Sequence, residues 1–567
     1  MHIFIEIGLI IFVATIVSIV MRLLKQPLIV GYILSGIIVG PYLLNLTQSS
    51  QYIELFSKLG IAILLFIIGL SLKPDIVREV GKVSVITGLG QVIVTSILGF
   101  LLMKLIGFSN TISFYGALAL TFSSTIIVLK LLSDKSDIGK LYGKISIGIL
   151  LMQDIIATIV LLLVSILGSF YSIEGSALIY ALSILIKGVA FFFVLYIFSK
   201  YLLPKISSFL ASSQELLFLF SMTWGLGLAA IFYKFGFSLE IGALAAGVSL
   251  SSSTFSQEIS SRMKPLRDFF ILLFFVMLGS QMILSSISII IFPAIIIALF
   301  ILFAKPFIVI FLMNLQGYRS RVSFLTGMTI AQISEFSLIL LTLALSFARI
   351  SREAVSLITL AGLISIAGST YLILYADKIY PYVRKIIKSF EVKKHNIGVK
   401  EEIKKDAEMI IFGYDRVGYD FVRVAEKLKN QYFVVDFNPK SIEKMVRNNI
   451  PCKFGDAEDV DFLEEIGTAS AKIIVSTVPD FKTNLNLVLY YRHHNQNGII
   501  VVLSHNIKDT QELYKSGASF VVMPHYLGAG HAAKMIENFG LNAEEFQKER
   551  KQHLEDLERR IKLTEEK

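Results

Sequence analysis

The sequence predicts a polytopic α-helical membrane protein that carries a Rossmann-like α/β domain near its C-terminal end. Of the 567 residues, 54% are hydrophobic and only 17% are charged, and the mean hydropathy is +0.70, far from the values of soluble proteins. About thirteen apolar runs are long enough to span a bilayer. They precede a region in which short apolar strands alternate with helical stretches, the pattern of a doubly wound parallel sheet.

The expected spans are residues 3–21, 28–46, 53–72, 83–106, 111–132, 143–168, 176–200, 214–234, 237–251, 266–288, 291–315, 320–347 and 353–378. The first run lacks a basic leading region and a small-residue cleavage site, so we expect a retained span rather than a signal peptide. Lysine and arginine residues gather on alternate connections, which places those connections and the C-terminal tail in the cytoplasm. The same distribution explains the net charge of +10 by membrane anchoring rather than by nucleic-acid binding.

The spans can be divided as about six, one linking span and six, an arrangement that inverts the second half relative to the first. Spans 5 and 12 then correspond, and clustered polar residues interrupt both at mid-depth. These residues are Thr121, Ser123, Ser124 and Thr125 in span 5 and Gln332, Ser334, Glu335 and Ser337 in span 12. Paired interruptions predict two broken, crossing helices whose ends face an ion site, with Ser124 and Thr125 among its ligands. Hydroxyl groups that only cap their own backbone are the alternative.

Two charged residues lie near the middle of other spans: Asp154, which follows Gln153 in span 6, and Lys305 in span 11. A charge at the centre of a spanning helix costs on the order of 3 kcal/mol, so such a residue is usually functional. We expect a proton and a monovalent cation, K+ or Na+, to compete for Asp154, and Lys305 to be its counter-ion in the ion-free state. A neutral buried acid and a lysine that snorkels to the interface are the alternatives.

Composition divides the chain into four parts. Residues 1–380 form the membrane domain, 381–405 a basic linker, 406–540 the Rossmann-like domain, and 541–567 a charged helical tail that is either solvated or a dimer contact. The chain has a single cysteine, Cys452, which excludes an intramolecular disulfide framework.

The Rossmann-like domain is expected to bind a nucleotide at its first turn. Its strands are expected at residues 409–412, 433–435, 473–476, 499–503 and 520–523. The first is followed by Gly413-Tyr414-Asp415-Arg416-Val417-Gly418, Asp436 ends the second where an acid can bind a ribose, and Asp456 comes later in Gly455-Asp456-Ala457. Asp415 would repel a dinucleotide and Arg416 would compensate in part. AMP is therefore favoured over NAD(H), and a domain that has lost its ligand is the alternative.

Several strings in the membrane domain resemble the cation:proton antiporter superfamily, and most closely its Kef-type potassium/proton branch. They are Gly31-Tyr32-Ile33-Leu34-Ser35-Gly36, Gly40-Pro41, Leu64-Leu65-Phe66-Ile67-Ile68-Gly69-Leu70, Ser123-Ser124-Thr125-Ile126-Ile127-Val128-Leu129, Gln153-Asp154, Phe274-Phe275 with Gly279, and Ala331-Gln332 with Glu335-Phe336. The soluble part resembles the nucleotide-binding, TrkA-N-like half of regulator-of-potassium-conductance domains.

The resemblance implies a homodimer in which a core domain, spans 4 to 6 and 11 to 13, moves against a dimerisation domain. It implies cation and proton binding at Gln153 and Asp154, a part for Lys305 in that site, and a role for Glu335 in offsetting the dipoles of the broken helices. Related sodium exchangers have two adjacent acids where this chain has Gln153 before Asp154, which favours potassium and electroneutral exchange.

The expected function is therefore exchange of a monovalent cation, K+ rather than Na+, for H+ across the cell membrane. Transport needs no cofactor and is gated by the soluble domain, with AMP or NAD(H) as the regulatory ligand. A ligand-gated potassium channel would require a filter of the TVGYG type, which the sequence lacks. A membrane-tethered, NAD-dependent oxidoreductase would require a catalytic constellation beside Asp415 and Asp436, and none accompanies them, so we expect no enzyme.

Overall fold

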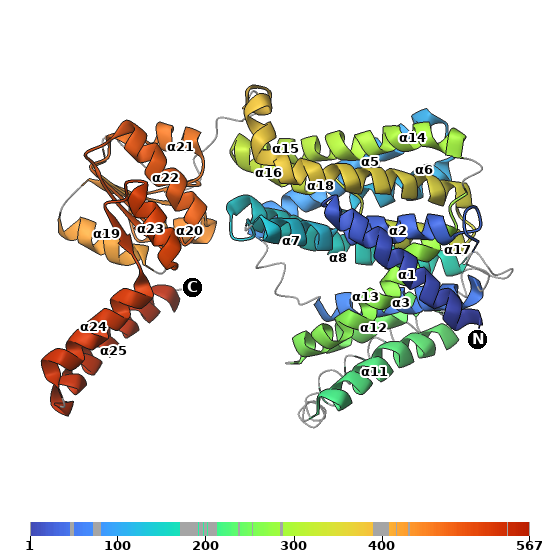
Figure 1. Cartoon of the computed structure of the whole chain (residues 1–567), viewed down its shortest axis with the longest axis horizontal. Coiled ribbons are helices and arrows are strands. Elements are labelled where there is room, and N and C mark those ends of the chain that lie inside the picture. The colour runs from blue at the N-terminus through green and yellow to red at the C-terminus, as the bar shows by residue number, and fades with distance from the viewer. Residues whose placement is uncertain are drawn as a thin grey trace. The chain divides into compact units, whose positions relative to one another are not determined.

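The computed structural model describes residues 2–45, 50–71, 81–135, 137–170, 213–235, 239–251, 255–283, 287–388, 407–414, 417–428, 431–540 and 542–565, with isolated positions 191, 195, 197, 201, 237 and 253. The chain divides into two compact units, Met1–Lys393 and Lys394–Lys567, whose elements are labelled in Figure 1. The expected linking span, 176–200, lies almost entirely outside the described residues.

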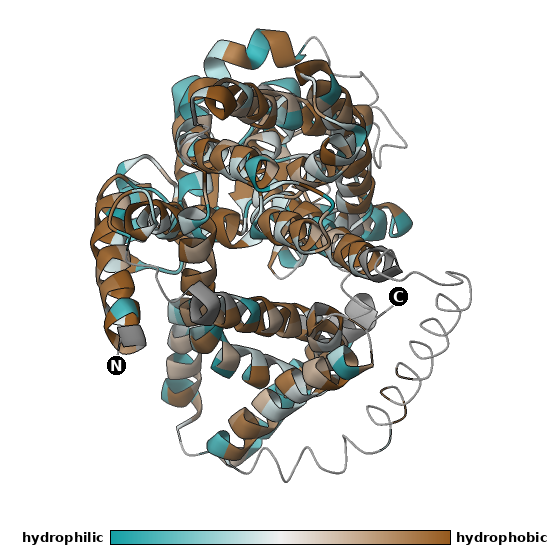
Figure 2. Cartoon of the chain, turned by 90° about the vertical axis from the view of Figure 1, so that its right-hand side faces the viewer, coloured by the Kyte–Doolittle hydropathy of each residue, from teal (hydrophilic) through white to brown (hydrophobic). Residues whose placement is uncertain are grey.

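The first unit is helical throughout its described part. Its helices are α1 (His2–Leu23), α2 (Leu28–Val39), α3 (Ser50–Ser71), α5 (Gly81–Ile106), α6 (Asn110–Thr121), α7 (Thr125–Asp134), α8 (Leu141–Phe170), α11 (Gln214–Lys234), α12 (Leu239–Leu250), α13 (Ser256–Ser280), α14 (Ile287–Leu299), the π-helix η3 (Phe300–Ala304), α15 (Lys305–Leu315), α16 (Ser320–Thr329), α17 (Glu335–Ser346) and α18 (Arg352–Lys388). Most of this ribbon is apolar (Figure 2). The expected spans of the described part are all found as helices.

Two helices end before their expected spans do, α2 at Val39 rather than residue 46 and α13 at Ser280 rather than residue 288, and two are extended at one end. Helix α13 begins at Ser256 rather than near residue 266, and α18 continues past residue 378 to Lys388. Both additions are polar helical turns. Hydropathy marks only the lipid-facing length of a helix, so a polar extension of the same helix escapes it.

The helices form two groups. Helices α1, α2, α3, α11, α12 and α13 pack on one another and are called the panel, and α5 to α8 pack with α14 to α18 to form the bundle. In Figure 1, α3, α11, α12 and α13 lie together in the lower part of this unit, and α5, α14, α15 and α18 in the upper part. The bundle contains spans 4 to 6 and 11 to 13, which confirms the expected grouping.

Close helix crossings at glycine hold the panel together. A Cβ atom added to Gly36 of α2 would lie 2.1 Å from a backbone oxygen of α13, and one added to Gly279 of α13 would lie 2.1 Å from a backbone oxygen of α2. Gly69 of α3 and Gly247 of α12 meet in the same way, at 2.5 and 2.1 Å. Spans 2 and 9 correspond in the inverted repeat, as do spans 3 and 10, so the two crossings are equivalent.

The bundle contains the two predicted broken helices. Helix α6 ends at Thr121 and α7 begins at Thr125, while α16 ends at Thr329 and α17 begins at Glu335. A serine caps each second half, since the hydroxyl groups of Ser124 and Ser334 accept bonds from backbone N–H groups of the following turn. The polar interruptions therefore restart each helix at mid-span.

The second unit is built on a parallel sheet in the order β3-β2-β1-β4-β5-β6. The strands are β1 (Met409–Phe412), β2 (Tyr432–Asp436), β3 (Cys452–Phe454), β4 (Ile473–Ser476), β5 (Ile499–Leu503) and β6 (Phe520–Val522). The helices are α19 (Gly418–Lys427), α20 (Pro439–Arg447), α21 (Val460–Glu465), α22 (Phe481–His494), α23 (Ile507–Lys515), α24 (Pro524–Phe539) and α25 (Ala543–Glu565). This order confirms the doubly wound fold and puts the switch point between β1 and β4. The sequence missed β3, because Lys453 stands at the centre of Cys452-Lys453-Phe454 and leaves no apolar run.

Candidate cation and nucleotide sites

The candidate cation site lies where α8 passes the break between α6 and α7. The hydroxyl group of Thr125 donates a hydrogen bond of 2.9 Å to the carboxylate of Asp154. Thr125 is the first residue of α7, and the N-terminal end of a helix carries a partial positive charge. The structure thus brings Asp154 to the hydroxyl group of Thr125 at the start of α7, whereas the hydroxyl of Ser124, the other predicted ligand, accepts a bond from the N–H of Ile127.

The two breaks are bonded to each other. The hydroxyl of Ser123 donates to the carbonyl of Ile330 at 3.0 Å, and the side-chain amide of Gln332 donates to the carbonyl of Ser124 at 3.3 Å. The side-chain oxygen of Gln332 accepts a bond of 2.8 Å from Ser369 on α18. Gln332 therefore lies at the helix crossing, where it was predicted.

Lys305 is placed differently from the prediction. Its ammonium group is fully buried and donates to the carbonyl of Phe122 at 3.0 Å and to that of Gln332 at 2.8 Å. The predicted ion pair with Asp154 is not formed. Carbonyl groups at the end of a broken helix have no helical N–H partner and carry a partial negative charge, so they attract the ammonium group of the lysine. Lys305 is thereby the link between the two breaks.

The local helix geometry explains how Lys305 reaches both breaks. The backbone N–H of Lys305 bonds the carbonyl of Phe300, five residues earlier, which closes the π-helix η3 before α15. Pro306 follows and has no N–H to offer the preceding turn. Such widened turns re-aim a side chain and are frequent at functional sites.

Glu335 occupies the first turn of α17. Its side chain is 6% exposed, and the hydroxyl of Ser334 donates to its carboxylate at 3.3 Å. A carboxylate at a helix N-terminus opposes the partial positive charge there. This is the position that the role implied by the resemblance requires.

Gln153 is turned toward the α6/α7 break. Its side-chain oxygen accepts a bond of 3.0 Å from the backbone N–H of Ser123, and its side-chain nitrogen donates to Gln91 of α5. Gln91 in turn donates to the carbonyl of Thr121 at 3.1 Å. The sequence analysis missed Gln91. A signal was present, since the polar residues Ser84, Thr87, Gln91 and Thr95 recur at helical spacing in span 4.

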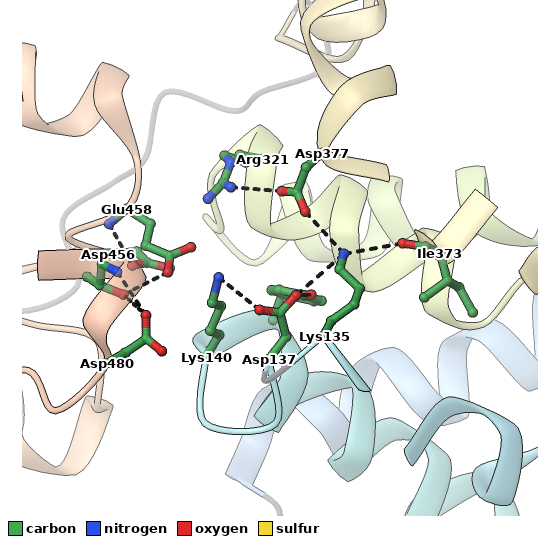
Figure 3. A network of polar contacts seen from close by, with 11 residues as sticks. Lys135, Asp137, Lys140, Arg321, Ile373, Asp377, Asp456, Glu458 and Asp480 are labelled. Carbon is green, nitrogen blue, oxygen red and sulfur yellow. Dashed lines mark hydrogen bonds and ion pairs between the residues drawn. The ribbon is translucent and has the colours of Figure 1, made fainter. Parts of the chain in front are cut away.

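A polar cluster lies at the far end of α7 (Figure 3). Asp137 is bonded by Tyr142 and lies 2.9 Å from Lys140 and 3.4 Å from Lys135. Asp377 of α18 bridges Lys135 at 3.1 Å and Arg321 at 3.0 Å. These contacts join α7 and α16, one half of each broken helix, to α18.

The candidate nucleotide site lies at the carboxyl ends of β1 and β2. Gly413 directly follows β1 and has a φ of +90°, and a Cβ atom on Gly418 would lie 2.0 Å from the carbonyl oxygen of Gly413. Both positions therefore require glycine. The carboxylate of Asp436 accepts bonds from the backbone N–H of Tyr414 at 2.9 Å and of Asn438 at 2.8 Å. Asp415 and Arg416 lie outside the described residues.

Asp456 and Cys452 flank this site on β3 and its following turn. The N–H of Gly455 bonds the carbonyl of Asp436 at 3.1 Å, and the carboxylate of Asp456 accepts from the N–H of Glu458 at 3.0 Å (Figure 3). Gly413, Gly418, Asp436 and Asp456 thus gather at one edge of the sheet. Burial, together with the nearby Asp436 carboxylate, raises the pKa of the Cys452 thiol to about 11. The thiol is therefore protonated and unreactive at neutral pH.

Comparison with known proteins gives the family. The family model described as "Sodium/hydrogen exchanger, transmembrane" matches residues 8–374, and the TrkA-N domain model matches residues 409–524. The chain belongs to the sodium/hydrogen exchanger family. It is a multi-pass membrane protein with a C-terminal TrkA-N domain, as the resemblance of its sequence strings predicted.

Three relatives show the range of similarity. K(+) efflux antiporter 4 of Arabidopsis thaliana is 30% identical over 56% of this chain and 54% of its own length. The putative K(+) efflux antiporter KefB of Alkalimonas amylolytica is 25% identical over 89% of this chain and 76% of its own. The putative cation/proton antiporter YbaL of Escherichia coli is 25% identical over 88% and 91%. The chain spans about half the length of the plant relative, 54%.

Proposed function

We propose that this protein exchanges K+ for H+ across the cell membrane and that both ions bind at Asp154. The observation that carries the proposal is the carboxylate of Asp154, held 2.9 Å from the hydroxyl of Thr125 at the break between α6 and α7. A lone carboxylate inside a spanning helix is costly, so it is favoured only with a proton or a cation bound. Two ions that compete for one carboxylate are exchanged when the site faces the two sides in turn.

The surroundings of Asp154 suit a cation better than a second protein charge. Lys305 is held by the two breaks and leaves the carboxylate free of an ammonium partner. The hydroxyl oxygen of Thr125 is a hard ligand of the kind that alkali cations prefer. By bonding both breaks, Lys305 also makes the two broken helices move as one body.

Potassium is the proposed cation, and Na+ is the second candidate. Gln153 stands before Asp154 where a second acid would add negative charge, so this pair on α8 supplies one charge for one monovalent ion. Two of the relatives are named as K(+) efflux antiporters and a third as a cation/proton antiporter. These names support transport by cation/proton exchange, and those of the first two support K+.

The test is proton movement driven by K+ or Na+ gradients in proteoliposomes, followed with a pH-sensitive dye. Asp154→Asn fixes the neutral form and is expected to abolish exchange while the protein stays folded. Asp268→Asn, at an exposed panel residue, is the matched control and is expected to exchange normally. Exchange by Asp154→Asn at the parent rate would refute the proposal, and equal rates with both cations would refute the potassium assignment.

Thr125→Val removes the hydroxyl group that touches Asp154 and keeps the shape of the side chain. We expect it to raise the K+ concentration for half-maximal exchange by about tenfold, the loss of one hydrogen bond to a charged group. Thr342→Val is the control, because the hydroxyl of Thr342 bonds only the carbonyl of Leu338 on its own helix, at 2.9 Å. Equal K+ dependence in the two variants would exclude Thr125 from the site.

The proposal extends to a homodimer whose cytoplasmic TrkA-N domain regulates exchange by binding an adenine nucleotide. The glycine turn at Gly413 and the acid at Asp436 are arranged as in nucleotide-binding sheets, at the switch point. A ligand alters gating only through different affinities for two states, so a tenfold change in activity needs about 1.4 kcal/mol of coupling.

Asp436→Ala should lower AMP affinity and change the response of exchange to AMP together, measured by calorimetry and by transport on the same preparation. A cut after residue 380 would remove the last turns of α18, including the buried Ile387, so the regulatory part is better removed after Lys393. That truncated protein should exchange at least as fast as the full chain. No binding of AMP or NAD(H) at millimolar concentration, with unchanged transport after truncation, would contradict this role.

A further inference from the structure

Two glutamine side chains from unbroken helices reach the break between α6 and α7. Gln91 of α5 and Gln153 of α8 are both fully buried. The side-chain nitrogen of Gln91 donates to the carbonyl of Thr121, its oxygen accepts from the nitrogen of Gln153, and the oxygen of Gln153 accepts from the N–H of Ser123. The two amides thus form one chain of hydrogen bonds across Phe122, here called the amide clasp.

The amide clasp satisfies backbone groups that the break would otherwise leave unpaired. The carbonyl of Thr121 and the N–H of Ser123 lie on either side of Phe122, and Lys305 takes the carbonyl of Phe122 itself at 3.0 Å. An unpaired buried peptide group costs about 1 to 3 kcal/mol. Each amide is both donor and acceptor, so the clasp pairs one group of each kind and adds no charge inside the membrane.

The clasp and the cation site share the same two elements. Gln153 and Asp154 are neighbours on α8, and their partners Ser123 and Thr125 lie two residues apart in the break. The bond from Ser123 to Gln153 and the bond from Thr125 to Asp154 are therefore two neighbouring hydrogen bonds between α8 and the break. A change in the bond between Ser123 and Gln153 moves the hydroxyl of Thr125 relative to the carboxylate of Asp154.

We propose that Gln91 is a positioning residue for the cation site, and that it acts through Gln153 to fix Thr125 against Asp154. The proposal rests on the proposed function, because it concerns the same site. It also changes the role of Gln153, whose two amide atoms are engaged with the protein rather than with the ion. The break between α16 and α17 is held differently, by its own Gln332, so the clasp serves the half of the crossing that faces Asp154.

Two substitutions of Gln91 give different pH profiles. Gln91→Met keeps the volume and removes the donor and the acceptor. It should raise the K+ concentration for half-maximal exchange by about tenfold at every pH, because the bonds of Gln91 to Thr95, Thr121 and Gln153 are all lost. Gln91→Glu can replace the amide only when it is protonated, because the neutral acid donates to Thr121 and accepts from Gln153 while the ionised acid cannot donate. It should resemble the parent protein at acid pH and depart from it at alkaline pH, where the ionised acid cannot donate to Thr121 and adds a buried negative charge.

The matched control is Gln316→Met. The side-chain amide of Gln316 also bonds α5, at 2.8 Å from the hydroxyl of Thr87, but it touches neither break. This variant loses a hydrogen bond between α5 and the end of α15 rather than at a break, so it should leave the K+ dependence and the pH profile unchanged. An equal effect of Gln316→Met and Gln91→Met would assign Gln91 a packing role and overturn the proposal.

Hydrogen exchange followed by mass spectrometry gives a readout that needs no transport. The N–H of Ser123 should exchange at least about tenfold faster in Gln91→Met than in the parent protein, because the opening of a local bond controls its protection. Gln91→Glu should show the protection of the parent protein at acid pH only. If Gln91→Met does not fold, this pH dependence in Gln91→Glu tests the proposal instead. If the N–H of Ser123 is protected equally in the parent protein and in both variants, Gln91 does not hold the break and the proposal is wrong. A parent protein that shows this protection without any K+-driven proton movement would overturn the proposed function alone.

Discussion

The panel and the bundle are both built of apolar helices but differ in how they bury their polar side chains. The described buried polar residues within the panel helices are all serines, namely Ser35, Ser57, Ser221, Ser249, Ser256 and Ser280. The hydroxyl groups of Ser35, Ser221, Ser249 and Ser280 each donate a hydrogen bond to a carbonyl of their own helix. In the bundle, the side chains of Gln91, Gln153, Lys305 and Gln332 bond other elements. The panel is held mainly by close packing, with the bond of 3.0 Å from Trp224 of α11 to Ser249 of α12 as an exception, and the bundle by polar contacts between helices.

This difference has a mechanical consequence. Backbone contact at the glycine crossings resists any change in the panel, because atoms at van der Waals distance have no room to shift. The breaks of the bundle lack continuous helical hydrogen bonding and would be loose without side chains that pair them. A rigid panel and a cross-bonded bundle are two bodies suited to move against each other while each keeps its internal structure.

The largest effect is expected from removing the link between the two breaks. Lys305→Met keeps the apolar stem and leaves the carbonyls of Phe122 and Gln332 unpaired. At about 1 to 3 kcal/mol for each carbonyl, the unfolding free energy should fall by about 3 kcal/mol, with a clear loss of thermal stability in detergent. Lys104→Met is the control, since the exposed Lys104 bonds only Phe108 at a helix end, at 3.2 Å.

The same experiment separates two roles of Lys305. If the lysine were instead the counter-ion of Asp154, added K+ would replace its charge and rescue the variant. The structure predicts no such rescue, because K+ at Asp154 does not bond the carbonyls of the breaks. If Lys305→Met melts at the same temperature as the parent protein, the link between the two breaks does not stabilise the bundle.

The panel should respond to added volume rather than to lost polarity. Gly279→Ala places a Cβ atom 2.1 Å from the backbone oxygen of Ile33, where no flexible side chain can give way. We expect a loss of about 2 kcal/mol in unfolding free energy, with an unchanged K+ concentration for half-maximal exchange in the folded protein. Gly227→Ala on α11 has no atom within 4 Å of the new Cβ and should be neutral or slightly stabilising. Equal effects of the two substitutions would show that the glycine crossings are not close-packed.

The sequence predicted the features of the membrane unit that depend on residue type along one helix. Apolar length predicted the spans, and clustered polar residues predicted both breaks and the placement of Asp154 and Thr125. It did not predict the partner of Lys305, because that choice depends on which carbonyls the folded breaks leave unpaired. Gln91 was missed for a related reason, since its partner Gln153 was assigned to the ion. The sequence did not predict β3 or the polar extensions of α13 and α18, because none of these segments contains a continuous apolar run.

The smallest effect is expected at the surface, where the two regions should behave alike. Asp377 joins α18 to Lys135 and Arg321 in the bundle, whereas Glu258 of the panel bonds Arg262 on its own helix at 2.7 Å. The acids are 44% and 49% exposed, and exposed ion pairs contribute only about 0 to 1 kcal/mol. Asp377→Asn and Glu258→Gln should therefore each lower the unfolding free energy by less than about 1 kcal/mol, and added salt should shrink both effects. A loss at Asp377 as large as that at Lys305 would mean that polar contacts between helices control the bundle at its surface as well as in its interior.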